Sequence, residues 1–209
     1  MAVKSIEGAL YGLVEMRVLV VHGLRGLHAL ARFVCLASLR EGVNVVHLAG
    51  DVKSPNTVRY LAESCGLRVM GFAGRIDDES VVKAFKDYGE YVESVVVELG
   101  GKKILNIGYN PLPERLRSAR EVDILVTYFA PLESVRQGLA LTSPLVDRVI
   151  ARTRPRSVLI TSCRETRHLG GFTCLGEALR GFYATIDLGP PGPVIVTSTF
   201  LDSHLRPQI

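Results

Sequence analysis

Residues 17–49 read RVLVVHGLRGLHALARFVCLASLREGVNVVHLA, and this stretch decides the fold class. The apolar, β-branched run at Arg17–Val21 predicts a buried strand, and the glycine-rich turn after it predicts a loop at the carboxyl end of that strand. Residues 27–41 have the apolar spacing of a helix. The strand pattern returns at residues 44–49, so the stretch predicts a βαβ unit with parallel strands.

The same alternation continues along the chain. Residues 57–65 have the spacing of a helix and Leu67–Phe72 repeats the strand pattern, so a second unit places further loops at the carboxyl ends of parallel strands. Gly100 and Gly101 join two β-rich runs and predict a hairpin. Further strands are predicted at residues 93–99, 102–107, 123–127, 157–161, 182–187 and 194–200, with a helix at 144–152. We expect one α/β domain at residues 17–201, an extension at 1–16 and a polar tail at 202–209.

The composition is that of a globular protein. Of 209 residues, 47% are hydrophobic and 22% are charged, which excludes disordered and low-complexity architectures. No apolar run approaches the roughly 20 residues of a membrane span and no signal peptide opens the sequence, so a cytoplasmic protein without membrane contact is expected. The net charge of +4 falls well short of that of a dedicated nucleic-acid binder.

The cysteines and one group of arginines give weaker signals. The cysteines at positions 35, 65, 163 and 174 lack CxxC spacing, so structural zinc and a disulfide framework are disfavoured and reduced thiols are expected. Arg152–Arg156, with Arg115, Arg117 and Arg120, can form a basic surface for nucleic-acid phosphates. No aromatic residues alternate with these arginines to stack on bases, so nucleic-acid binding is disfavoured.

Five short motifs stand at the carboxyl ends of predicted strands. They read Gly23-Leu24-Arg25-Gly26, Gly50-Asp51, Gly74-Arg75-Ile76-Asp77, Thr127-Tyr128-Phe129-Ala130-Pro131 and Thr161-Ser162-Cys163-Arg164-Glu165. In this order they resemble the motifs of the calcineurin-like metallophosphoesterases, particularly the small phosphoesterases, over residues 17–188. The resemblance implies an α/β fold of the metallophosphoesterase type: a β-sandwich of two mixed sheets flanked by helices, with a two-metal site at one edge.

Most of the metal ligands that the resemblance implies are replaced. Asp51, whose counterpart bridges the two metals in the family, is kept. The other ligand positions hold Gly23, Arg25, Arg75, Tyr128, Ser162 and Arg164. A two-metal phosphoesterase needs oxygen and imidazole ligands, and an arginine does not deprotonate in proteins. We therefore expect a degenerate member of the family that has lost the two-metal site and holds no cofactor.

The replaced positions define a candidate site at the sheet edge. Its residues are His22, Arg25, Asp51, Arg75, Asp77, Tyr128, Ser162, Arg164 and Glu165. The arginines either pair with leftover carboxylates, present guanidinium groups to a phosphate-type anion, or point to solvent. His22 is either a base or a structural hydrogen-bonding residue. No residue of this set is assigned a catalytic role.

Two functions stay open, beside a sensor of anions or nucleotides built on the same arginines, which saturable binding without turnover would mark. The first is a catalytically inactive binding or scaffold module with an arginine-lined anion site, whose partner is an unknown protein or a small anionic ligand. The second is a phosphoesterase that hydrolyses phosphomonoesters or phosphodiesters at an atypical metal held by Asp51, Asp77 and Glu165. The Val-rich strand predicted at Glu93–Leu99 also offers an edge for a homodimer.

Overall fold

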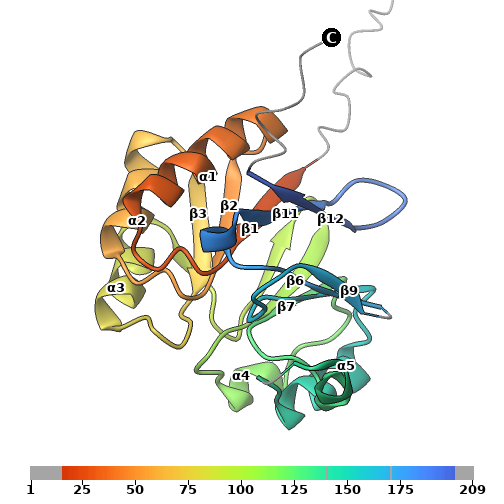
Figure 1. The fold of residues 1–209 in the computed structure, drawn as a ribbon. Helices are drawn as coiled ribbons and strands as arrows, with labels where there is room; N and C mark the ends of the chain where they lie inside the picture. The colour runs from red at the N-terminus through yellow and green to blue at the C-terminus, as the bar shows by residue number, and fades with distance from the viewer. Residues whose placement is uncertain (1–15, 140, 170, 201–209) are drawn as a thin grey trace, which may run out of the picture.

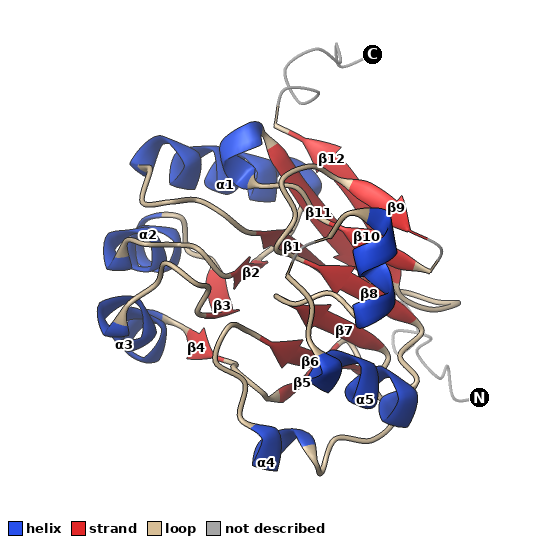
Figure 2. Ribbon diagram, turned by 60° about the horizontal axis from the view of Figure 1, so that its bottom comes forward, coloured by secondary structure: helices blue, strands red, loops and turns tan. Residues whose placement is uncertain are grey.

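Two β-sheets packed face to face form the centre of the molecule, and helices cover their outer faces (Figure 1, Figure 2). The computed structural model describes residues 16–139, 141–169 and 171–200. The strand order is β12-β11-β1-β2-β3-β4 in sheet A and β5-β6-β7-β8-β10-β9 in sheet B. The predicted α/β sandwich of two mixed sheets flanked by helices is confirmed.

Sheet A combines four parallel strands with an antiparallel pair. Strands β1 to β4 run parallel to one another, β11 is antiparallel to β1, and β12 is antiparallel to β11. The strands are β1 (Arg17–Val21), β2 (Val45–Ala49), β3 (Arg68–Phe72), β4 (Glu90–Tyr91), β11 (Phe182–Asp187) and β12 (Val194–Thr199). The covering helices are α1 (His28–Glu41), α2 (Pro55–Arg59), which continues as a π-helical turn (Tyr60–Ser64), and α3 (Glu79–Tyr88).

Sheet B has a parallel centre and antiparallel edges. Strands β6, β7, β8 and β10 run parallel, whereas the edge strands β5 and β9 are antiparallel to their neighbours. The strands are β5 (Val96–Leu99), β6 (Lys102–Ile107), β7 (Ile124–Thr127), β8 (Ser157–Ile160), β9 (Arg167–Leu169) and β10 (Phe172–Cys174). Its outer face carries α4 (Pro113–Leu116), α5 (Pro144–Thr153) and a short 3₁₀ turn at Leu132–Gln137. A second 3₁₀ turn, Ala178–Arg180, leads into β11 of sheet A, and its Ala178 packs in the core under the helices of that sheet.

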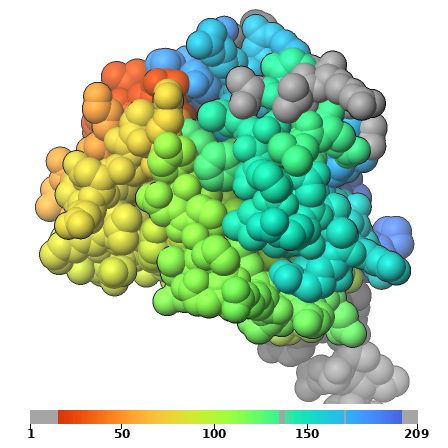
Figure 3. Space-filling view, turned by 90° about the horizontal axis from the view of Figure 1, so that it is seen from below, coloured from red at the N-terminus to blue at the C-terminus, as the bar shows by residue number. Residues whose placement is uncertain are grey.

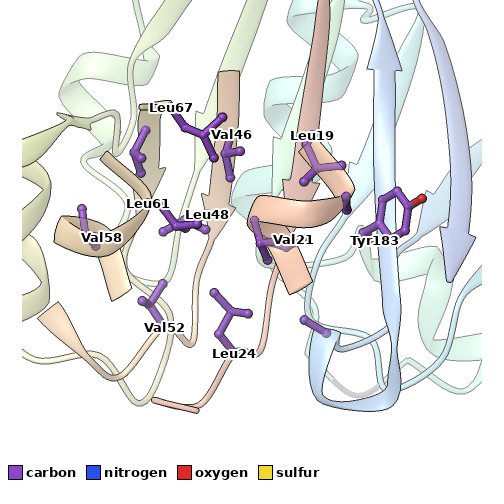
Figure 4. Close-up of a cluster of buried hydrophobic side chains, with 14 of the residues drawn as sticks. Leu19, Val21, Leu24, Val46, Leu48, Val52, Val58, Leu61, Leu67 and Tyr183 are labelled. Carbon is purple, nitrogen blue, oxygen red and sulfur yellow. The ribbon is translucent and has the colours of Figure 1, made fainter. Parts of the chain in front are cut away.

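Strand β1 lies between two hydrophobic cores. Leu19 and Val21 face the helices of sheet A, where they pack with Leu48 and Leu61 (Figure 4). Residues 18 and 20 point the other way, into the core between the two sheets. A strand that is buried on both faces needs apolar residues at every position, because successive side chains alternate between the faces. This explains the uninterrupted apolar run that predicted β1.

Several elements differ from the sequence-based expectation. The strand predicted at residues 93–99 begins only at Val96, because Ser94 adopts a positive φ of 57°. The prediction missed α3, although Asp78 caps this helix by accepting a hydrogen bond from the Ser80 amide. It also missed β4, α4, β9 and β10, which have between two and four residues each. Segments this short do not contain a full period of an apolar pattern.

The cysteines are paired, so the expectation of reduced thiols is wrong for this structure. Disulfides join Cys35 to Cys65 and Cys163 to Cys174, with Cα atoms 5.9 Å apart in each pair. The first pair links α1 to the end of the π-helical turn, and the second links the loop after β8 to β10. The partners are 30 and 11 residues apart in sequence, and only the packing of those elements brings them together.

The ends of the predicted domain are only partly visible. The Met16 carbonyl accepts a hydrogen bond from the Leu188 amide, and its side chain packs on the core between the sheets, so Met16 belongs to the packed body. The rest of the predicted extension and the predicted tail at 202–209 lie outside the described residues. No helix in the described part of the chain is long and apolar enough to cross a bilayer.

Candidate functional site

A pocket of about 490 Å³ lies at the carboxyl ends of β1, β2, β3, β7 and β8. Its lining includes the predicted residues His22, Arg25, Asp51, Arg75, Tyr128, Ser162, Arg164 and Glu165. The sequence analysis did not foresee Leu139, Arg167 and Glu177, which also line it. The topology places the strand-end loops side by side, as expected for parallel strands in an α/β sheet.

The Asp51 carboxylate is already satisfied by protein groups. Asp51 is buried and has a positive φ of 55°. Its Oδ1 accepts the Ile76 amide at 3.3 Å, and the Tyr128 hydroxyl donates to both carboxylate oxygens at 3.3 and 3.2 Å. Burial, followed by the Asp51 charge, raises the pKa of Tyr128, so the phenol keeps its proton and remains a donor. Tyr128 therefore caps the carboxylate with a hydrogen-bond donor.

Asp77 does not line the pocket. Its carboxylate accepts hydrogen bonds from the Lys53 amide at 2.5 Å and from the Gly74 amide at 2.7 Å. The Lys53 bond ties the loop after β2 to the loop after β3, and the Gly74 bond holds the second loop in its own turn. Burial raises the pKa of Asp77, and the backbone hydrogen bonds oppose that rise. Asp77 thus holds together the loops that carry Asp51 and Arg75, and it is not among the residues that line the pocket.

The three predicted arginines behave differently from one another. Arg25, at a positive φ of 52°, forms an ion pair with Glu177 at 2.5 Å. Arg75 and Arg164 are exposed, and neither has a carboxylate within 4.0 Å in the described part of the chain. One arginine is therefore neutralised, and two present their guanidinium groups at the pocket mouth.

His22 is a structural residue of the pocket wall. Its Nε2 lies 3.0 Å from the Cys163 carbonyl and 3.1 Å from the Leu175 carbonyl, so this nitrogen carries the proton and donates to both. Burial lowers the pKa of His22, which keeps the ring neutral. The ring thus joins the end of β1 to both ends of the loop that the Cys163–Cys174 disulfide closes.

Solved structures share this architecture. The protein TT1561 of Thermus thermophilus superposes with a TM-score of 0.69 at 15% identity, over 89% of this chain and 99% of that one. An archaeal phosphodiesterase gives 0.58 at 12% identity, over 88% and 100% of the two chains. A dimetal phosphatase from Danio rerio gives 0.52 at 12% identity, over 88% and 99%. The fold is that of the calcineurin-like metallophosphoesterases. No protein-family model matches the sequence, and no curated protein matches it.

The metallophosphoesterase fold implies two metal ions, and the residues at this edge do not fit them. Asp51 is occupied by Tyr128 and the Ile76 amide, and Glu177 by Arg25. Glu165 is exposed and lies 3.9 Å from Arg167 and 3.8 Å from Arg180. Within the described residues, no three His, Cys, Asp or Glu side chains come together as a metal-binding group. A guanidinium cannot replace an imidazole as ligand, because it has no free electron pair to donate.

Proposed function

We propose that this protein is a non-catalytic binding module and that its strand-end pocket binds a phosphate-type anion without a metal. The observation that carries the proposal is a pair of guanidinium groups, those of Arg75 and Arg164, that have no carboxylate partner among the described residues and line the edge where the fold otherwise holds metals. A guanidinium offers planar, fixed donors that match two oxygens of one phosphate. The guanidinium groups thus take the place of metal ions as the positive partner of the anion.

The charge of the pocket supports an anionic ligand. Four arginines and three carboxylates line it, which leaves one net positive charge. Each carboxylate has another partner: Asp51 has Tyr128, Glu177 has Arg25, and Glu165 lies within 4 Å of Arg167 and Arg180. Repulsion of an incoming anion is therefore reduced where Arg75 and Arg164 stand.

Titration calorimetry with phosphate, sulfate and mononucleotides tests this proposal. We expect saturable binding, and Arg75→Ala and Arg164→Ala should each weaken it at least tenfold, because a hydrogen bond to a charged group contributes about 1.5–3 kcal/mol. Arg32→Ala is the matched control, since Arg32 is an exposed arginine on α1 outside the pocket. An absence of heat with every anion at millimolar concentration contradicts the proposal.

The neighbouring structures support a phosphoesterase as the second candidate function. It requires a metal held by Asp51, Asp77 and Glu165, yet Asp77 is tied to the Lys53 and Gly74 amides and lies outside the pocket lining. We expect no Mn²⁺-dependent hydrolysis of an aryl phosphate. Two results together would establish the phosphoesterase instead. They are turnover that Asp51→Ala abolishes, and one or two metal ions retained per chain after desalting.

The Cys163–Cys174 disulfide is expected to hold the anion site in shape. It closes the loop that carries Arg164, Glu165 and Arg167. Replacing both cysteines by serine should weaken anion binding about tenfold, because binding must then order a looser loop. The double variant of Cys35 and Cys65, whose disulfide lies outside the pocket, loses stability and keeps its affinity. Calorimetry beside thermal unfolding checks this, and equal affinity in both double variants contradicts it.

A further inference from the structure

A second groove lies at the edge of sheet B and is independent of the proposed anion site. It has a volume of about 490 Å³ and shares no lining residue with the strand-end pocket. One wall comes from residues 94–96 and Lys103 at strands β5 and β6, and the other from Arg115 and Arg120 at α4 and the turn after it. Figure 3 looks onto this end of the molecule, where the green residues around α4 lie beside the teal α5.

The groove lies beside an open sheet edge. Strand β5 pairs with β6, from Val96↔Leu105 to Leu99↔Lys102, and it is the last strand of sheet B. On its other side, the backbone groups of β5 have no strand partner among residues 16–139, 141–169 and 171–200. β5 contains neither proline nor lysine, the residues that commonly protect an edge from pairing. Val96 is 37% exposed, so an apolar surface joins the open edge to the groove.

Cations dominate the far side of the groove. The Lys103 ammonium lies 3.7 Å from Glu121, whose side chain is 89% exposed, so this ion pair is weak. Arg115 has no carboxylate within 4.0 Å in the described ranges. One guanidinium nitrogen of Arg120 donates to the Arg117 and Ala119 carbonyls, and its other donors stay available. Glu98, opposite Lys103 in the register, is the nearest acid on β5.

We propose that β5 accepts an extended acidic peptide of a partner protein as an added strand. The open edge supplies backbone hydrogen bonds, and every second side chain of the peptide faces the groove, where a carboxylate meets Lys103, Arg115 or Arg120. Nucleic acid fits less well, because it cannot complete a β-ladder and no aromatic ring lines the groove for base stacking. A four-residue edge matches a peptide segment of about 13 Å.

Fluorescence anisotropy with a labelled peptide of alternating glutamate and valine tests this proposal on the full-length protein. We expect saturable binding, at least tenfold weaker in Arg115→Ala/Arg120→Ala and unchanged in Arg32→Ala and in the pocket variant Arg75→Ala. A peptide that is N-methylated at alternate residues should not bind, because it lacks the amide donors of a strand. Amide hydrogen exchange at residues 96–99 should slow when the unmodified peptide is bound.

Three results overturn the proposal. Equal binding of the N-methylated peptide shows that charge alone attracts it. Stronger binding of a single-stranded oligonucleotide, lost in the same double variant, identifies a nucleic-acid surface instead. No saturable binding of the peptide below about 1 mM excludes the site. Because Arg75→Ala acts only on the anion pocket, failure of this proposal and failure of the anion proposal are distinguishable.

Discussion

Replacing Glu93 by glutamine is expected to stabilise the protein more at pH 8 than at pH 4. The free energy of unfolding of the variant minus that of wild type should be about 3 kcal/mol larger at pH 8. Glu93 is buried, with 1% of its surface exposed, and burial raises its pKa from 4.5 to about 7. Between these two values the folded protein keeps a proton that the unfolded chain has released. The carboxyl group therefore favours folding at acid pH, and this contribution is lost as the pH rises through 7.

The surroundings of Glu93 explain why its charged form is disfavoured. Burial outweighs two hydrogen bonds that favour the charged form, in which Oε1 accepts the Gly108 amide at 2.8 Å and the Ser94 hydroxyl at 3.2 Å. Its Oε2 is buried and has no hydrogen-bond partner among the described residues. A Cβ at position 108 would stand 2.0 Å from Oε2, so only glycine lets the carboxyl fit there. A neutral amide occupies this place without the desolvation penalty of a carboxylate.

Two buried histidines make the stability depend on pH in the opposite direction. Burial lowers the pKa of His47 to about 4 and also lowers that of His22. Both rings stay neutral in the folded protein while the unfolded chain takes up protons below about pH 6.5, so their contribution is present above that pH and is lost on acidification. The free energy of unfolding of the wild type therefore changes with pH in opposite directions for Glu93 and for the histidines. The difference between wild type and Glu93→Gln isolates the contribution of Glu93.

Urea unfolding of both proteins between pH 4 and pH 8 measures that difference. Glu98→Gln serves as the control for removal of a carboxylate, because Glu98 is exposed on the neighbouring strand β5. A difference between wild type and Glu93→Gln that stays constant across the pH range would show that Glu93 titrates alike in the folded and unfolded states, so that burial does not raise its pKa.

The sequence predicted the strands and helices whose pattern of apolar residues repeats within a single element. The run at β1 and the helical spacing of α1 identified a βαβ unit because strand burial and helix amphipathicity repeat within a few residues. Strands β9 and β10 have three residues each, and their existence depends on pairing with each other and with β8. Such tertiary pairing leaves no periodic trace in the sequence.

The sequence predicted which loops form the candidate site, but it predicted less well which side chains of those loops line it. Strand ends converge whatever their loops contain, which is why Arg75 and Arg164 line one pocket. Asp77 comes from the same loop as Arg75, yet amides of two loops hold its carboxylate and it does not line the pocket. Glu177 was missed because its pairing with Arg25 spans 152 residues and no local pattern encodes it.

Gly74→Ala is expected to lower the free energy of unfolding by about 3 kcal/mol or more and to remove anion binding. A Cβ at position 74 would stand 2.2 Å from the Asp51 amide nitrogen and 2.3 Å from its Oδ1. The nitrogen belongs to the backbone, and the carboxylate is held by the Ile76 amide and the Tyr128 hydroxyl, so the loops after β2 and β3 must separate. That movement breaks the bond from the Lys53 amide to Asp77, at 2.5 Å, and displaces Arg75, the neighbour of Gly74, from the pocket.

Gly192→Ala is the matched control for this substitution. A Cβ at position 192 would meet only the end of the Arg156 side chain, at 3.3 Å, and that side chain can move aside. Its free energy of unfolding should stay within about 0.5 kcal/mol of wild type. Urea unfolding and phosphate calorimetry on both variants therefore distinguish two effects. One is the general effect of replacing a glycine by alanine, and the other is the loss of contact between the loops after β2 and β3. If Gly74→Ala matches Gly192→Ala in both measurements, the loops do not approach closely, and the support that Asp51 and Asp77 give to Arg75 must be rejected.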